Sequence, residues 1–349
     1  MQLVYKLLWS LLALSVSVVL LYLCLRQVDL TMLVQDIEHV RRTYLFAAWL
    51  CIVAMIGVAA LEWRLLVPAG HRVSLNSLLR IVALMVMIQN SLHHFAGHAF
   101  AIFQLGSRQR LTKSGALSIL ATDQLAEGFA RLTVWGLLAL VIELPHWAVQ
   151  GLRSVVWGVG CLYAVLLVFA WTHHKPNGQQ VLVRPSTWKR LTFHLAQWAH
   201  NLRGVRDPRI TLGAIGLALM KKFLRATAVY CVQCSLGVEL PIYAPLLVVG
   251  ALDLATMVSV TPGHLGIFEA TVFFTYQYLG VEPTTAMTMA LFEHLVFLLA
   301  MVLPGVAVSL RWGFHFSTTV GQEPELLPAP HVAKVVRHSQ RIAPATVGK

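Results

Sequence analysis

Charged side chains are scarce in this sequence, and that scarcity decides its class. Asp, Glu, Lys and Arg make up 12% of the 349 residues, whereas soluble domains carry about 25%. Apolar residues make up 57%, and the mean hydropathy is +0.69. This composition excludes an ordinary soluble domain and predicts an all-α polytopic membrane protein.

The sequence also lacks the motifs of soluble enzymes. It has no Gly-x-Ser-x-Gly nucleophile motif, no phosphate-binding P-loop and no dinucleotide-binding fingerprint. The five cysteines include one Cys-x-x-Cys pair, Cys231 and Cys234, and no second pair that would complete a metal site. We therefore expect no cofactor, no metal, no disulfide framework and no direct ATP hydrolysis.

Long apolar runs are what the sequence has instead. A membrane-spanning helix needs about 20 residues, and several runs reach that length. No small-residue cleavage site follows the run after Lys6, so we expect a retained helix there rather than a signal peptide. The expected helices cover residues 7–25, 44–62, 78–92, 115–143, 151–171, 210–235, 244–258, 266–279 and 284–310.

The distribution of Lys and Arg orients these helices, because short basic loops stay in the cytoplasm. Residues 172–209 carry seven basic residues and one acid, whereas the loops 144–150, 236–243 and 280–283 carry no Lys or Arg. Both termini are then cytoplasmic. The net charge of +12 forms an inward-facing collar that attracts anionic lipid headgroups, and no nucleic-acid partner is needed to explain it.

Two regions, 78–105 and 244–279, are broken into pairs of apolar pieces too short to span. All the basic loops lie in the cytoplasm only if each pair of pieces enters and leaves the membrane on the same side. We therefore expect a helix bundle with two re-entrant broken-helix segments.

The two broken regions resemble each other in sequence. Gly97-His98 matches Gly263-His264 at the breaks, and further along the chain Asp123 falls opposite Glu293. By the charge distribution, the two copies enter the membrane from opposite sides. They are expected to form an inverted repeat, as in many transporters.

The second break has the sequence TPGHLGIFEA, residues 261–270. Pro and Gly interrupt a helix at membrane depth only where the freed backbone is buried in protein or lines water. We expect Pro262 and Gly263 to make the turn, Gly266 to allow close backbone approach, and Glu269 to enter the next half-helix. The alternative is a plain loop between helices, although the flanking pieces are each too short to span about 30 Å upright.

Ionisable side chains inside apolar runs are costly, so each needs a partner or a function. Asp123, Glu127 and Arg131 recur every four residues on one helix face. Two interpretations stay open: the charges neutralise one another, or they line a cavity where cations hold phosphate and acids hold an amine or hydroxyl group. The candidate substrate-binding residues are Glu269, His264, Gly263, Pro262, Gly266, Asp253, Asp123, Glu127, Arg131, Lys221, Arg225, Glu293 and His98.

Histidines near the first break allow a metal hypothesis. His94 and His98 have the i, i+4 spacing of zinc ligands on a helix. No His-Glu-x-x-His pattern or Cys/His cluster accompanies them. We expect polar lining rather than a metal site.

Two stretches resemble the lysylphosphatidylglycerol synthase transmembrane family: the segment from Trp63-Arg64 to Phe100, and SVTPGHLGIFEA at 259–270. The second break of that family is Pro-Gly-Gly-x-Gly-x-x-Glu, which is kept here except for His264 at the middle Gly. The first break, Pro-Gly-x-x-Gly-(Glu/Asp), is poorly kept, with Ala96 in place of Pro and Phe100 in place of the second Gly.

The resemblance spans roughly residues 40–310, and it implies movement of an amphipathic lipid between leaflets of the bacterial inner membrane. The implied partners are membrane lipids: an anionic phospholipid, a glycolipid or a hopanoid-type lipid. The soluble aminoacyl-transferring domain of fused members is not present in this sequence, so lipid lysylation is not expected. Two alternatives stay open, an integral-membrane lipid-modifying transferase and a non-transporting scaffold of a lipid-modification complex.

The organisation expected from these patterns is a flippase-like membrane domain over residues 1–316 and a disordered cytoplasmic tail over 317–349. The tail contains four prolines and few large apolar residues. A homo-oligomer or a partner from lipid biosynthesis is compatible with the sequence, which names neither the lipid nor the energy source.

Overall fold

The computed structural model describes most of the membrane region, and the longest stretches outside the description are 1–14, 173–206 and 313–349. Residues 173–206, which hold most of the expected basic loop, and 313–349, which include the expected tail 317–349, lie outside the described residues. The described residues are 15, 19–68, 70–92, 94–109, 111–144, 146–172, 207–257 and 261–312.

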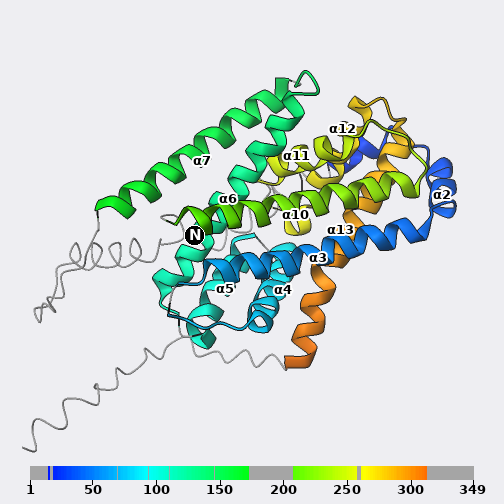
Figure 1. The fold of residues 1–349 in the computed structure, drawn as a ribbon. Coiled ribbons are helices and arrows are strands. Elements are labelled where there is room, and N and C mark those ends of the chain that lie inside the picture. Colours follow the sequence, from blue (N-terminus) through cyan, green and yellow to red (C-terminus); the bar gives the residue numbers. More distant parts are fainter. Residues whose placement is uncertain are drawn as a thin grey trace, which may run out of the picture. The chain divides into compact units, whose positions relative to one another are not determined.

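Every regular element in these ranges is a helix (Figure 1), as the composition predicts. The helices are α2 (Leu30–Glu38), α3 (Arg42–Leu66), α4 (Leu75–Ser91), α5 (His94–Gln109), α6 (Lys113–Ala139), α7 (His146–Thr172), α10 (Pro208–Ser235), α11 (Ala244–Thr256), the short 3₁₀ turn η1 (Pro262–His264), α12 (Ile267–Tyr278) and α13 (Pro283–Trp312). Eight expected helices, from 44–62 to 284–310, correspond to α3, α4, α6, α7, α10, α11, α12 and α13. Of the expected helix 7–25, the described residues 15 and 19–25 are helical.

Local signals in the sequence fix several helix ends. The side chains of Ser74, Thr112 and Asp207 accept hydrogen bonds from backbone N–H groups in the first turns of α4, α6 and α10. Gly237 and Gly280 follow the ends of α10 and α12 with φ of 68° and 84°. A left-handed residue is favourable for Gly and stops the helix.

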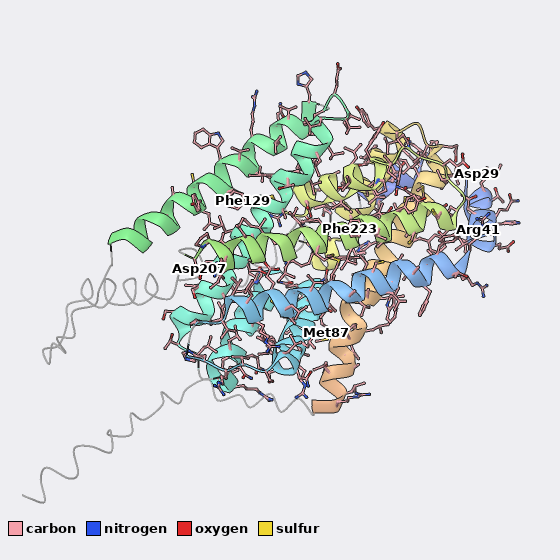
Figure 2. All side chains as sticks on the ribbon, in the orientation of Figure 1. Asp29, Arg41, Met87, Phe129, Asp207 and Phe223 are labelled. Atoms are coloured by element: carbon pink, nitrogen blue, oxygen red, sulfur yellow. The ribbon has the colours of Figure 1, made fainter. Side chains whose placement is uncertain are left out.

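The molecule carries its apolar side chains outward and its charges inward. On α10, Lys221 and Lys222 are buried, whereas the next residue, Phe223, is 65% exposed and points away from the bundle (Figure 2). On α7, Trp157 is 74% exposed. An exposed apolar surface of this kind suits lipid rather than water.

Membrane crossing is also supported by helix length. Three described segments are long and apolar enough to span a bilayer: α3, residues 148–165 of α7, and residues 283–311 of α13. Helices α4 and α11 are apolar but shorter. The chain is therefore a multi-pass membrane protein, and re-entry of the short helices from one face stays a prediction.

The helix contacts have an internal symmetry. Helices α3, α4, α5 and α6 correspond in order to α10, α11, α12 and α13, and corresponding helices have corresponding neighbours. Helix α4 packs on α13 as α11 packs on α6, and α3 packs on α13 as α10 packs on α6. The equivalent helices α3 and α10 lie side by side (Figure 1) and run antiparallel, because the Arg41 N–H donates to the Ser235 carbonyl at one end and Gly213 meets Leu65 at the other. Antiparallel packing of equivalent helices is what an inverted repeat produces.

The first break differs from its expected position. Gly97 and His98 lie inside α5, and the interruption falls between the end of α4 at Ser91 and the start of α5 at His94. A Cβ at Gly97 would lie 2.2 Å from Cγ of Gln89 and 2.6 Å from the Met85 carbonyl oxygen. Gly97 therefore serves the close packing of α5 on α4 rather than a turn.

Close packing also gives a prediction at Gly305, where α13 crosses α4. A Cβ there would lie 2.4 Å from Cβ of Met87 and 2.7 Å from the Ala83 carbonyl oxygen, so the helices would have to move apart. We expect Gly305→Ala to lower the free energy of unfolding by about 1–3 kcal/mol, the usual cost of overpacking. Thermal unfolding in detergent measures it.

The matched control for Gly305 is Gly216 of α10, whose added Cβ meets no atom within 4 Å. Gly216→Ala should leave stability unchanged or raise it by up to about 1 kcal/mol, because Ala favours a helix. Equal melting temperatures for the two variants would contradict the assigned packing of α13 on α4.

Candidate functional site

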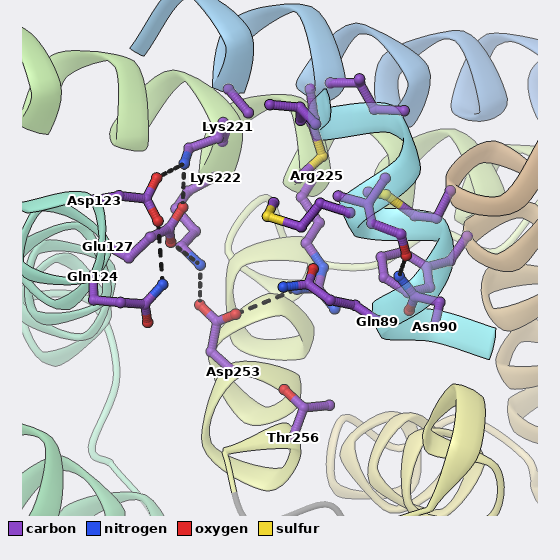
Figure 3. A pocket seen from close by; sticks show the side chains of 18 of the residues that line it. Gln89, Asn90, Asp123, Gln124, Glu127, Lys221, Lys222, Arg225, Asp253 and Thr256 are labelled. Carbon is purple, nitrogen blue, oxygen red and sulfur yellow. Dashed lines mark hydrogen bonds and ion pairs between the residues drawn. The ribbon is translucent and has the colours of Figure 1, made fainter. Parts of the chain in front are cut away.

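A polar cavity of about 230 Å³ lies between α3, α4, α5, α6, α10, α11 and α13. Its lining combines apolar side chains such as Met55 and Met85 with charged and amide side chains. Figure 3 shows the cations of α10 between the carboxylates of α6 and Asp253 of α11, with Gln89 and Asn90 of α4 on the other side.

Lys221 is the centre of the charge network. Its Nζ lies 2.6 Å from Oε1 of Glu127, 2.7 Å from Oε2 of Glu62 and 3.8 Å from Oδ1 of Asp123. Asp123 also accepts hydrogen bonds from the Trp63 indole N–H at 3.1 Å and from the amide of the adjacent Gln124 at 3.2 Å. One lysine therefore joins α3, α6 and α10 through three carboxylates.

The other two cations of α10 extend the network to α11. Nζ of Lys222 lies 2.7 Å from Asp253 and 3.1 Å from Glu127. Arg225 donates to Oδ1 of Asp253 at 3.3 Å, and its guanidinium lies 5.3 Å from the centre of the Phe297 ring. Such a cation–ring contact favours a guanidinium in a desolvated place.

The cavity charges balance. Four carboxylates, Glu62, Asp123, Glu127 and Asp253, face four cations, Lys221, Lys222, Arg225 and Arg131, so the formal sum is 4 − 4 = 0. Arg131 lines the cavity, and within the described part of the chain its Nε has no hydrogen-bond partner. Most of these charges are thus paired with one another and surround a cavity, and the binding of a headgroup by them stays a prediction.

The second break has a strained backbone, in agreement with its sequence. Gly263, His264 and Gly266 have φ of 62°, 59° and 82°. His264 occupies the position where the family motif has its middle Gly, and a left-handed conformation costs a non-Gly residue roughly 1–2 kcal/mol. His264 lines the polar cavity, so the break borders it directly.

Glu269 and His294 hold this break in place. Oε2 of Glu269 accepts from the Gly266 N–H at 2.7 Å, and Oε1 lies 2.7 Å from Nδ1 of His294. The other ring nitrogen of His294 lies 2.8 Å from the Gly263 carbonyl oxygen, and Phe268 stacks on the ring at 4.3 Å. We call this arrangement the clamp.

Hydrogen-bond accounting fixes the proton content of the clamp. A carbonyl oxygen only accepts, so Nε2 of His294 donates to Gly263. The contact between Nδ1 and Glu269 then needs one further proton, on the nitrogen or on the carboxyl oxygen. The clamp holds that proton in a site where Glu269 is 4% and His294 3% exposed.

The candidate residues fall into three groups. His98, Asp123, Glu127, Arg131, Lys221, Arg225, Asp253 and His264 line the polar cavity. Gly263, Gly266 and Glu269 belong to the clamp beside it, and Pro262 begins η1. Glu293 lines a separate small cavity.

Two members of the charge network, and His294 of the clamp, were missing from the candidate residues. Glu62 is fully buried and pairs with Lys221, and Lys222 bridges Glu127 and Asp253. Glu62 ends an apolar run in the sequence, which suggested a membrane boundary there, whereas α3 continues to Leu66.

One histidine of α5, His98, takes part in the polar lining. His98 Nε2 lies 3.1 Å from Nε2 of Gln89 and lines the cavity. His93 and the side chain of His94 lie outside the described part of the structure.

The fold and the cavity define a class of protein: a multi-pass α-helical membrane protein with a charged cavity enclosed by apolar helices. This chain belongs to the lysylphosphatidylglycerol synthase TM region family, which matches residues 10–305. No curated protein and no solved structure gives a significant match. The resemblance seen in the two breaks is confirmed, and the family makes this a membrane protein that handles lipids.

Proposed function

We propose that this protein translocates a lipid or lipid-linked molecule between leaflets, holding the headgroup in the polar cavity without modifying it chemically. The observation that carries the proposal is the placement of Lys221, Lys222, Arg225 and Asp253 around a cavity inside apolar helices. A headgroup crosses hydrocarbon only if its charges meet partners on the way.

The balanced charges favour a headgroup with groups of both kinds. A phosphate would bind Arg131, which lines the cavity, because a guanidinium matches phosphate with two parallel hydrogen bonds. An amine or hydroxyl group would bind Asp253. An anionic phospholipid, a glycolipid and a hopanoid-type lipid with a polar headgroup are the classes to compare.

The inverted arrangement of helices supports alternating access to this cavity. Sites of this kind lie at the interface of the two repeats, where broken helices meet. Here the break at Gly263 and His264 borders the cavity, and α10 of one repeat supplies the cations to acids of both. Rocking of one repeat against the other would open the cavity to each leaflet in turn.

The cellular setting is part of the proposal. We propose the bacterial inner membrane, with both termini in the cytoplasm, because the basic loops then lie inside. The proposed partners are membrane lipids, together with a second copy of the chain or a lipid-biosynthesis protein.

The experiment is leaflet exchange of labelled lipids in liposomes that hold the purified protein. Wild type is compared with Asp253→Asn and Arg225→Gln across anionic, cationic and glycosylated headgroups. We expect exchange to fall by about tenfold or more in both variants, since losing one partner of a buried charged contact costs about 2–5 kcal/mol.

The matched control is Glu239→Gln, which removes a carboxylate that is exposed in the loop after α10. It should exchange lipid at the wild-type rate. Folded wild-type protein that exchanges none of these lipids would favour the transferase or the scaffold instead.

A further inference from the structure

A small cavity of about 20 Å³ lies beside the polar cavity. Arg225, Phe268 and Phe297 line both cavities, and Glu293 lines only the small one. A volume of this size holds about one water molecule, provided that polar partners are present. Arg225 and Glu293 are the polar members of its described lining.

Glu293 heads a chain of buried polar groups that leads away from the cavities. Its Oε1 accepts a hydrogen bond from the Tyr276 hydroxyl, and that hydroxyl accepts one from the Gln233 amide at 3.2 Å. Gln233 lies two residues before the end of α10 at Ser235. The polar groups therefore run from the small cavity almost to the end of α10.

The second oxygen of Glu293 is the unusual atom. Oε2 is buried and has no hydrogen-bond partner among the described residues, and the side chain as a whole is 5% exposed. A carboxylate left partly unpartnered in an apolar place becomes neutral rather than remaining charged. Since Oε1 accepts from Tyr276, Oε2 is the oxygen that would carry the proton of a neutral Glu293.

Among the described residues that line the small cavity, Arg225 is the cation that could pair with Glu293 once its proton is lost. The charged and titratable groups placed at Glu293 are Tyr276 on α12 and Arg225 on α10, and Asp253 on α11 is reached through Arg225. Elsewhere on α13, His294 pairs with Glu269 of α12, and Thr288 donates to Asp36 of α2. Glu269 is engaged by His294, and α3 contributes the apolar Ile52. Helix α4 meets α13 far along the helix, at Gly305.

We propose that Glu293 is a proton-binding site coupled to lipid translocation through Arg225. While Arg225 is held by Asp253, as in this structure, Glu293 keeps its proton. When the amine or hydroxyl of a headgroup takes Asp253, Arg225 turns across the small cavity and pairs with Glu293. The carboxyl then releases one proton to water, and it takes one back when the headgroup leaves.

This coupling rests on the proposed function, and it makes one proton move for each headgroup bound at Asp253. Because the arginine pairs with Glu293 only after the proton is lost, lipid exchange should rise with pH. The limit for one titrating group is about tenfold per pH unit. A pH gradient across the liposome should bias the direction of exchange.

The test measures lipid exchange in liposomes against pH, with and without a pH gradient, for wild type, Glu293→Gln, Glu293→Asp and Glu239→Gln. We expect the pH dependence and the response to the gradient to vanish in Glu293→Gln, to shift in Glu293→Asp and to stay unchanged in Glu239→Gln. A flat profile in wild type, or a wild-type profile in Glu293→Gln, would overturn the coupling.

A second measurement separates this proposal from the first. Infrared spectra of the protein in an ester-free detergent, recorded before and after addition of the lipid that it exchanges, detect the protonated carboxyl group. We expect lipid to remove that band in wild type and Glu293→Gln to lack it. If wild type exchanges no lipid, the proposed translocation fails, and an unchanged band would overturn the proton site as well.

Discussion

Replacing Lys221 with methionine should destabilise the protein by about 3–5 kcal/mol and abolish lipid exchange. The ammonium lies 2.6 Å from Glu127 and 2.7 Å from Glu62, and Asp123 is within 3.8 Å. Methionine keeps the unbranched shape and removes the charge, so three buried acids lose their shared partner. Breaking a buried ion pair from one side typically costs this much, because it leaves uncompensated charge.

Thermal unfolding in detergent, followed by tryptophan fluorescence, measures the loss for Lys221→Met. The control is Arg209→Gln, which removes a cation from the exposed start of the same helix and should change stability little. The double variant Lys221→Met with Glu62→Gln should recover part of the stability, because it also removes one of the carboxylates left without a partner. The free-energy changes of substitutions at residues in contact are not additive. A Lys221→Met protein as stable as wild type would show that the network contributes nothing to folding.

Most of the helices could be predicted from the sequence because apolar runs decide them. The exceptions are instructive. Helix α2 is short and carries Asp36 and Glu38, so no apolar run marks it. Helix α5 is a second exception, because Gly97 and His98 suggest a break where the helix is continuous, whereas Gly97 is needed there because neighbouring α4 leaves room only for Gly.

The cavity was only partly predictable, for a different reason. Lys221, Lys222 and Phe223 are consecutive, and only the rotation of α10 tells which of them face inward. Glu62 illustrates the same limit, since its burial depends on α3 continuing to Leu66 and packing on α10. Composition predicts that charges inside a membrane find partners, whereas the partners themselves depend on helix packing.

Glu269 is a motif residue whose two carboxylate oxygens bond within the protein. The sequence placed it among the candidate substrate-binding residues, and in the structure both its oxygens are occupied within the protein. Oε2 accepts from the Gly266 N–H and Oε1 meets His294, each at 2.7 Å. The carboxyl ties α13 to the break, and the break in turn shapes one wall of the cavity through His264.

Glu269→Ala should therefore lower stability by about 3–5 kcal/mol and abolish exchange together, because His294 and the first turn of α12 lose their acceptor. Glu269→Gln keeps an acceptor for the Gly266 N–H and should lose less. Melting temperature and leaflet exchange are measured on the same samples, with Glu239→Ala as the exposed control. If Glu269 instead touched the headgroup, the alanine variant would lose exchange while melting like wild type. A joint loss of stability and of lipid exchange indicates a residue that stabilises the break, whereas a loss of exchange alone indicates a residue that binds the lipid.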